Sequence, residues 1–327
     1  MTILRRLTTC VAAAATLLLA GMPGFGVAQT YPSKPIRLIL TQGPGSGSDV
    51  IGRMFAVKLS EGLGQSVMVE NRTGATGIIG HDYVLKSPPD GYTLLLSTTA
   101  PLIIVPAINA QAKFRAADFT AVTPIFRGDF VIFTANLPGA PKTLQELIER
   151  LRAKPENFAS AGAGTMGHLV SEVFLRQMGL RATHIPYKGS GQSLNDLAGG
   201  HVLFTSDSTA AASALLRAGR LNPLVVTGTE RLASLPQVPT LAEAGIKVAR
   251  AMGSFGGIFA PPGTPKEIVA RLNAEAARAL QNPELKARLA AIEVETLILS
   301  PENFAEYVRQ EASFWERFVG ELGVKIE

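Results

Sequence analysis

Short apolar runs alternate with amphipathic helical patterns along nearly the whole chain. The run Ile36–Leu40 predicts a buried strand, and Asp49–Leu63 predicts the helix after it, because Ile51, Phe55 and Leu59 recur every four residues. Alternation of this kind is typical of a mainly parallel sheet with helices on both faces. We therefore expect an α/β fold.

The alternation comes in two series, and 327 residues suit two lobes. Strands are also expected at 67–69, 92–96, 130–133, 158–160, 183–186, 202–205 and 224–227, with helices at 78–85, 143–154, 168–178 and 210–218. Further helices are expected after Pro265 and from Pro301, where Trp315 belongs to an apolar helix face and has no ligand role. The chain is expected to cross between the lobes near Ile125–Phe130 and Ala249–Phe255.

The first 28 residues have the pattern of a signal peptide. Arg5 and Arg6 precede the apolar run Val11–Ala20, and small residues lead to a cleavage site after Ala28. The run is short for a membrane span, which needs about 20 apolar residues, although an N-terminal anchor is the alternative interpretation. We expect export to the periplasm, with the Sec and twin-arginine routes both open.

Residue composition excludes several classes of site. Cys10 is the only cysteine, so disulfide frameworks, thiolate zinc sites and iron–sulfur clusters are excluded. The four histidines have no metal-ligand spacing, and no Lys/Arg-rich run follows the first segment, although the formal net charge is +5. We expect no metal, no cofactor and no nucleic-acid partner.

Three loops carry the chemistry of anion binding. Gly43–Asp49, Ser97–Thr99 and Ser160–His168 each follow a predicted strand, where open α/β sheets bind ligands. Each loop offers small residues, backbone N–H groups and hydroxyls. Tight turns without a ligand are the alternative interpretation of any one loop, but three together favour an anion site.

Two other motifs compete with this interpretation. Gly162, Gly164 and Gly167 match the dinucleotide-binding pattern, but residues 173–195 contain no acid for the ribose hydroxyls. A secreted hydrolase using a serine and His168 is the alternative function, although no G-x-S-x-G motif is present. At the start of a predicted helix, His168 could equally be a capping residue or a hydrogen-bond donor to an anion.

An ordered set of motifs resembles one family. The motifs are Tyr31–Ile36, Val69–Arg72, Gly74–Gly80, Pro89–Leu94, Ser160–Thr165, Pro186–Gly189, Val238–Thr240 and Ala260–Pro265. With these motifs in this order, the chain from residue 31 to residue 327 is similar to the Bug-type extracytoplasmic solute receptors, the substrate-binding components of tripartite tricarboxylate transporters.

The resemblance implies a two-lobed periplasmic-binding-protein fold of the Venus-flytrap, type II-like kind. Residues 29–126 and 251–327 would form the first lobe and residues 127–250 the second. It implies a monomeric receptor rather than an enzyme, which closes on a small carboxylate and delivers it to membrane transporter subunits. Coupling to a sensor kinase is an open alternative.

The resemblance also implies which residues bind the ligand, through backbone amides, hydroxyls and ordered water. Carried over by position, they are Ser46, Gly47, Ser48, Asp49, Thr98, Thr99, Gly164, Thr165, His168 and Asp207. Leu102 and Val105 depart from the family's usual polar residues, which predicts an apolar wall in the cleft. A monocarboxylate with an apolar or aromatic body is therefore expected rather than citrate.

Overall fold

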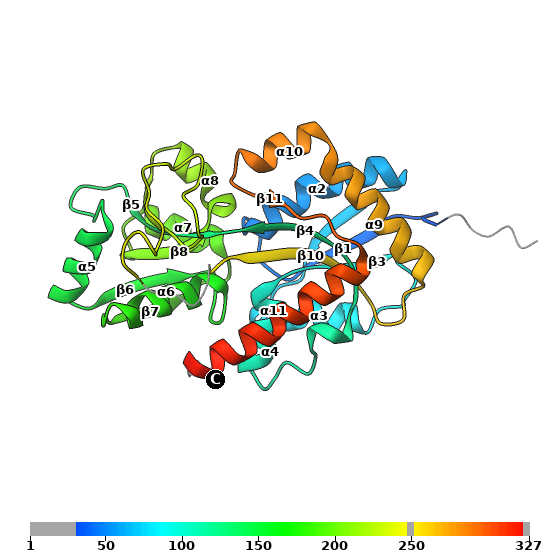
Figure 1. Ribbon diagram of the computed structural model, residues 1–327, viewed down its shortest axis with the longest axis horizontal. Helices are drawn as coiled ribbons and strands as arrows, with labels where there is room; N and C mark the ends of the chain where they lie inside the picture. Colours follow the sequence, from blue (N-terminus) through cyan, green and yellow to red (C-terminus); the bar gives the residue numbers. More distant parts are fainter. Residues whose placement is uncertain (1–30, 247–251, 323–327) are drawn as a thin grey trace, which may run out of the picture. The chain divides into compact units, whose positions relative to one another are not determined.

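The computed structural model describes residues 31–246 and 252–322 (Figure 1). The expected signal peptide lies outside the described residues, as does part of the second expected crossing. All of the strands and helices below belong to the compact unit that begins at Lys34. Within the described residues, every helix is too short or too polar to cross a bilayer.

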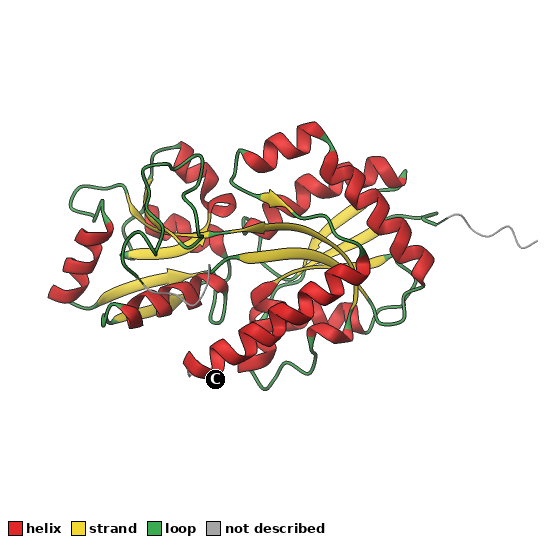
Figure 2. Cartoon of the chain, viewed as in Figure 1, coloured by secondary structure: helices red, strands yellow, loops and turns green. Residues whose placement is uncertain are grey.

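The described part of the first lobe contains a six-stranded mixed sheet in the order β11-β4-β10-β3-β1-β2. Figure 2 shows the strands of both sheets in yellow and the helices around them in red. Strand β1 runs parallel to both of its neighbours, β2 and β3, whereas β10 is antiparallel to β3 and β4. The strands are β1 (Ile36–Leu40), β2 (Val67–Asn71), β3 (Thr93–Thr98), β4 (Thr120–Gly128), β10 (Ser254–Ala260) and β11 (Glu295–Thr296).

The second lobe contains a five-stranded sheet in the order β7-β6-β8-β5-β9. Its strands are β5 (Phe130–Ala135), β6 (Glu156–Ser160), β7 (Ala182–Pro186), β8 (Phe204–Ser208) and β9 (Leu221–Val226). The predicted two-lobed α/β fold is confirmed, with both sheets mixed. The antiparallel strands β5 and β10 enter their sheets from the other lobe, so no crossover helix sets them parallel to their neighbours.

Helices cover both faces of each sheet. Successive side chains of a strand point to opposite faces, so adjacent residues of one strand pack against different helices. In β1, Leu40 contacts Gly52 of α2, whereas Ile39 belongs to the core shared with α3, α4 and α11. In β5, Ile132 packs toward α5 and α6, and Phe133 toward α7 and α8. The helices are α2 (Gly47–Leu63), α3 (Ile78–Leu85), α4 (Val105–Ile108), α5 (Leu144–Ala153), α6 (Met166–Gln177), α7 (Ser190–Ala198), α8 (Thr209–Arg217), α9 (Lys266–Gln281), α10 (Pro283–Ala290) and α11 (Pro301–Leu322).

The chain passes from the first sheet to the second at Asp129, the one residue between β4 and β5. Ser254, the first residue of β10, pairs with Gly128, so two adjacent strands lead from one lobe toward the other (Figure 1). The carboxyl-terminal ends of β3, β4 and β8 lie beside these crossings and line one cavity together with Asp129 and Ser254.

Candidate functional site

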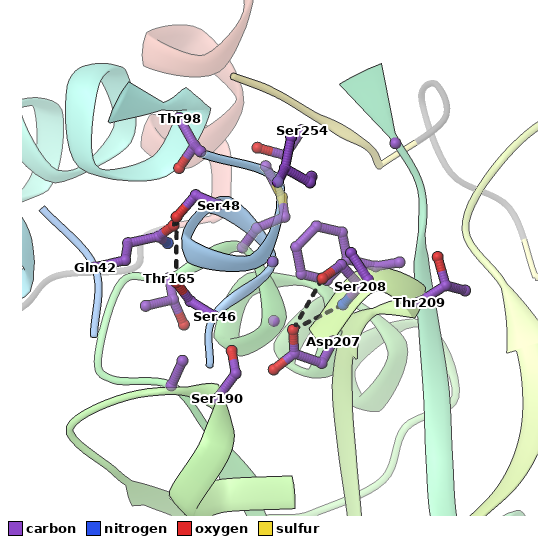
Figure 3. Close-up of a pocket in the computed structure, with 18 of the residues that line it drawn as sticks. Gln42, Ser46, Ser48, Thr98, Thr165, Ser190, Asp207, Ser208, Thr209 and Ser254 are labelled. Atoms are coloured by element: carbon purple, nitrogen blue, oxygen red, sulfur yellow. Dashed lines mark hydrogen bonds between the residues drawn. The ribbon is translucent and has the colours of Figure 1, made fainter. Parts of the chain in front are cut away.

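A cavity of about 60 Å³ is lined by residues of both lobes (Figure 3). One buried water needs about 10–15 Å³ in this measure, so the cavity suits a small molecule. Six residues carried over from the family resemblance line it: Ser46, Gly47, Ser48, Thr98, Thr165 and Asp207. Asp49, Thr99, Gly164 and His168 are not among its lining residues.

Four helices of the described chain begin at this cavity. The first residues of α2, α6, α7 and α8 line it, namely Gly47, Met166, Ser190 and Thr209. The first N–H groups of a helix have no acceptor within the helix, and the helix dipole adds positive potential at that end. The cavity therefore offers an anion several backbone donors without any cationic side chain.

Serine and threonine side chains cap three of these helices. Ser46, Thr165 and Ser208 each accept a hydrogen bond from the third backbone N–H of the helix that follows. This capping orders the first turn and leaves the N–H groups of the first two helical residues for a ligand. In the first lobe, the Ser46 and Ser48 hydroxyls lie 3.2 Å apart, and Ser48 donates to the Gln42 side chain.

The two lobes approach each other closely at the α2 and α8 N-termini. A Cβ atom added to Gly47 would lie 2.5 Å from the Ser208 Oγ atom, so only glycine fits this approach without a shift. The Gly45 backbone lies against Gly191 of the second lobe in the same region. These contacts bring the donors of both lobes around one small volume.

Asp49 positions a loop and does not line the cavity. Its carboxylate accepts hydrogen bonds from the Gly45 N–H, Arg53 and Asn71, each at 3.0 Å. Burial alone would raise the pKa of Asp49, but these hydrogen bonds outweigh burial and lower its pKa below the usual value. Similarly, the Thr99 hydroxyl accepts from the Phe255 N–H at 3.0 Å and so ties the end of β3 to β10.

Gly164 and His168 hydrogen-bond to each other and do not line the cavity. The Gly164 N–H donates to Nδ1 of His168 at 3.0 Å, so that amide is already used. His168 stacks on His184 with ring centroids 4.0 Å apart, and His184 Nε2 lies 2.7 Å from the Ser160 hydroxyl. Burial, with the nearby His168, lowers the pKa of His184 to about 4. This arrangement supports the loop that leads into α6.

Three acidic residues line the cavity, Asp129, Asp207 and Glu293, whereas its described lining contains no Lys, Arg or His. The Asp207 carboxyl accepts the Ser208 N–H at 2.7 Å, and burial raises its pKa to about 6 against the opposing hydrogen bonds from Ser190 and Ser208. Burial also raises the pKa of Asp129, whose carboxyl lies against Gly228 and Gly253.

The expectation of an apolar wall from Leu102 and Val105 is wrong. Both side chains are fully buried and neither lines the cavity. Leu102 lies in a π-helical turn over Ala100–Ile104 and packs in the hydrophobic core, and Val105 is the first residue of α4. Other residues supply apolar surface to the cavity instead: Ile51, Ala100, Phe126, Phe130, Met166 and Val294.

Several lining residues were missed at the sequence level, including Gln42, Ser190, Ser208, Thr209 and Ser254. Ser190 follows the loop Pro186–Gly189 between a strand and a helix, so the same rule that selected the other loops could have found it. Ser208 and Thr209 directly follow Asp207 at the end of β8. Ser254 had no such signal, because it opens a strand that enters from the other lobe.

The hydrolase alternative requires a serine and His168; the described lining of the cavity includes serine and threonine hydroxyls, and neither His168 nor His184 is among its lining residues. Ser160 and His184 are hydrogen-bonded, but Ser160 is fully buried and lies outside the cavity lining. Within residues 31–246 and 252–322, no group of three His, Cys, Asp or Glu side chains is arranged to hold a metal ion.

A family model and solved structures of known proteins both resemble this chain, and they indicate the same family. Residues 51–324 match the model of the tripartite tricarboxylate transporter family receptor. The structure of the periplasmic binding protein BugD superposes with a TM-score of 0.85 at 28% identity, covering 91% of this chain and 100% of BugD.

Two further solved structures contain ligands. Rpa4515 of R. palustris, solved with adipate, is 33% identical with a TM-score of 0.85, covering 90% of this chain and 99% of that one. MatC (Rpa3494) from Rhodopseudomonas palustris, solved with bound malate, is 28% identical with a TM-score of 0.80, covering 88% and 100%.

Proposed function

We propose a function for this chain, which belongs to the tripartite tricarboxylate transporter receptor family; the model of that family matches most of its length. The protein is a periplasmic solute receptor that captures a small carboxylate and delivers it to the membrane subunits of a tripartite transporter. It performs no catalysis. The structures with adipate and malate support the carboxylate class, and the expected signal peptide supports the location.

The observation that carries the proposal is the convergence of four helix N-termini on one small cavity of the described chain. Hydrogen bonds to a charged acceptor contribute about 1.5–3 kcal/mol each, so a few backbone and hydroxyl donors suffice to hold a carboxylate. A cationic side chain is therefore not required, and the described lining has none.

This arrangement supports a proposal for the residues that contact the ligand. We assign the carboxylate to the α2 N-terminus (Ser46, Gly47 and Ser48) in the first lobe and to Thr165 and Asp207 in the second, with Thr98 on the side of β3. Asp49, Thr99, Gly164 and His168 serve as positioning residues. Phe126, Phe130 and Met166 supply the surface for a carbon body, which favours an acid with an apolar or aromatic body over citrate.

The proposal is tested by identifying what the protein binds. The exported protein is purified, and small molecules released on denaturation are identified by mass spectrometry. Calorimetric titration with adipate, malate, benzoate and citrate then measures affinity, beside esterase and peptidase assays. We expect one carboxylate bound per chain and no turnover. Hydrolysis that requires His168, or stoichiometric binding of only neutral or cationic molecules, would overturn the proposal.

A further inference from the structure

The cavity contains a charge conflict that the proposed function does not resolve. Three acidic residues line it, and its described lining includes no cationic side chain. A bound carboxylate would add a further negative charge to this volume. Like charges this close to one another are unfavourable in a partly dehydrated site, and one way to remove the repulsion is for a carboxyl group to bind a proton.

Asp207 is the acidic residue placed to meet the ligand. It stands next to the end of β8, directly before the first turn of α8, and only 5% of its surface is exposed. Its Oδ1 atom accepts both the N–H and the hydroxyl of Ser208, at 2.7 and 3.4 Å. Figure 3 shows the carboxyl between Ser190 and Ser208, facing the same space as Ser46 and Thr165.

The other two lining acids have different surroundings. Both oxygens of Asp129 lie against the backbone of Gly228 and Gly253, at the crossing between the lobes. Oε1 of Glu293 accepts the Ser234 N–H at 2.6 Å. Both residues also line a second, larger opening on the protein surface, where water solvates a charged carboxylate better than in the cavity.

The remaining titratable groups near Asp207 are already engaged or face solvent. Asp49 on α2 is paired with Arg53 at 2.9 Å. His168 on α6 accepts the Gly164 N–H and lies 3.7 Å from Glu172. Lys188, before α7, is exposed. A cation that could neutralise Asp207 is therefore absent from the described residues that surround it.

We propose, resting on the function above, that Asp207 binds the ligand as a neutral carboxylic acid and donates a hydrogen bond to a ligand carboxylate oxygen. Oδ1 keeps the Ser208 hydrogen bonds, and Oδ2 carries the proton. When the ligand anion binds, Asp207 takes up one proton from solvent and keeps it as long as the complex exists. Burial, which raises the pKa of Asp207 to about 6 in the free protein, agrees with this assignment.

The inference predicts the direction of a pH dependence. Because the complex holds one more proton than the free protein above about pH 6, carboxylate affinity falls as the pH rises. The slope approaches tenfold per pH unit. Near pH 5, Asp207 is already protonated in the free protein, so it no longer contributes to the pH dependence of the affinity. An ionised Asp207 that accepted a hydrogen bond from a ligand hydroxyl or ammonium group would give no proton uptake.

The test measures proton uptake by calorimetry at pH 7.5, in two buffers of different ionisation enthalpy, with adipate, malate, benzoate and citrate as probes. We expect the wild type to take up close to one proton for each ligand molecule that binds. Asp207→Asn retains an acceptor for the Ser208 N–H and an N–H₂ donor for the ligand. It should take up none at pH 7.5, and its affinity for benzoate, whose single carboxyl group is ionised throughout, should be equal between pH 5.5 and 8. Asp129→Asn, which removes the same charge from the same cavity, should still take up about one proton.

The outcomes separate this inference from the proposed function. Carboxylate binding by the wild type without proton uptake would overturn the inference and leave the receptor function standing, even if Asp207→Asn did not fold. Uptake that disappears in Asp129→Asn but persists in Asp207→Asn would also overturn it. Absence of binding by every probe between pH 5.5 and 8 would overturn the proposed function and the inference together.

Discussion

The Thr165 side chain orders the loop and the first helical turn that line one side of the cavity. Its hydroxyl donates to the Gly162 carbonyl at 2.8 Å and caps α6 by accepting the His168 N–H. Loss of a helix cap costs about 1 kcal/mol, and here the disordered turn would be one that lines the cavity. We expect Thr165→Val to weaken carboxylate binding by about tenfold, or roughly 1.4 kcal/mol, measured by calorimetry.

A matched control for this change is Thr143→Val. Thr143 caps α5 in the same way, by accepting the Glu146 N–H at 3.2 Å, but α5 does not line the cavity. The control should lose a similar amount of stability and bind the carboxylate like the wild type. Equal effects of the two changes on affinity would show that the Thr165 cap has no special role in binding.

Asp49 gives a second prediction at the scale of a residue. Its pKa is lowered by hydrogen bonds that outweigh burial, so the ionised carboxylate stabilises the fold above its unfolded pKa, and this contribution is lost as the pH falls below about 4. Asp49→Asn should reduce the free energy of unfolding by about 1–3 kcal/mol at pH 7. Urea denaturation should show this deficit shrinking toward pH 3.

The exposed pair of Asp82 and Lys86 provides the control for Asp49. Asp82 lies on α3 and Lys86 directly follows the last residue of that helix; both side chains are solvent-exposed, and such surface pairs contribute about 0–1 kcal/mol. Asp82→Asn should therefore change stability little at pH 7. A deficit for Asp49→Asn that stayed constant from pH 7 to pH 3 would contradict the assigned role of its charge.

Asp49 also shows where sequence reasoning reached its limit at this scale. Its place after a strand and in the first turn of a helix selected it together with Ser46 and Ser48, whose side chains do line the cavity. Its side chain turns instead toward Asn71, which the pairing of β1 with β2 brings beside it. Local pattern predicts which loop reaches the site, whereas the direction of each side chain depends on partners distant in the sequence.

At the scale of elements, strands with regular apolar patterns were predicted and irregular ones were missed. β4 contains Pro124, and β10 contains Gly256 and Gly257, residues that weaken a strand pattern. The glycines have a tertiary cause, because a Cβ on either would meet the ring of Phe126 or Phe304 within 2.3 Å. Only the packed structure explains why this strand tolerates them.

Gly47 carries a prediction about how two helices approach. A Cβ there would displace the Ser208 hydroxyl, which caps α8 and hydrogen-bonds to Asp207. The two residues lie in different lobes, so a small separation of the lobes relieves the clash without unfolding either one. We expect Gly47→Ala to weaken carboxylate binding by tenfold or more while changing the unfolding free energy by less than about 1 kcal/mol.

Calorimetry and urea denaturation of the same variant provide the measurement. Gly320→Ala is the matched control, because an added Cβ at Gly320 of α11 would meet nothing within 4 Å. That control should bind like the wild type. If Gly47→Ala lost stability in proportion to its loss of affinity, the change would have damaged a lobe rather than its approach to the other.

At the scale of the whole molecule, the cavity depends on residues of both lobes, which within the described chain are linked at Asp129 and at the start of β10. Donors from both lobes surround one ligand only when the lobes are together, so a ligand that uses both favours the closed arrangement. Small-angle scattering should show a smaller radius of gyration with saturating carboxylate than without it. Identical values would count against closure on the ligand.

One direct hydrogen bond between the lobes offers a sharper test of closure. The Thr76 hydroxyl donates to the Ala163 carbonyl of the second lobe at 2.9 Å. Thr76 and its neighbour Ala75 have positive φ angles of 51° and 45°, a conformation that costs non-glycine residues about 1 kcal/mol or more each. In the Gly74–Gly77 turn, Ala75 and Thr76 therefore adopt unfavourable backbone angles, and in this conformation the Thr76 hydroxyl reaches the other lobe.

Thr76→Val should therefore weaken carboxylate binding by about fivefold, because a hydrogen bond of about 1 kcal/mol is lost only from the closed arrangement. Scattering should show the variant less compact than the wild type at equal, subsaturating carboxylate. Thr120→Val is the control: it removes a hydroxyl bound to the Pro261 carbonyl at 3.1 Å, a bond within the first lobe. Since that bond survives opening, Thr120→Val should leave affinity unchanged. Equal affinity of Thr76→Val and wild type would show that this bond does not contribute to closure.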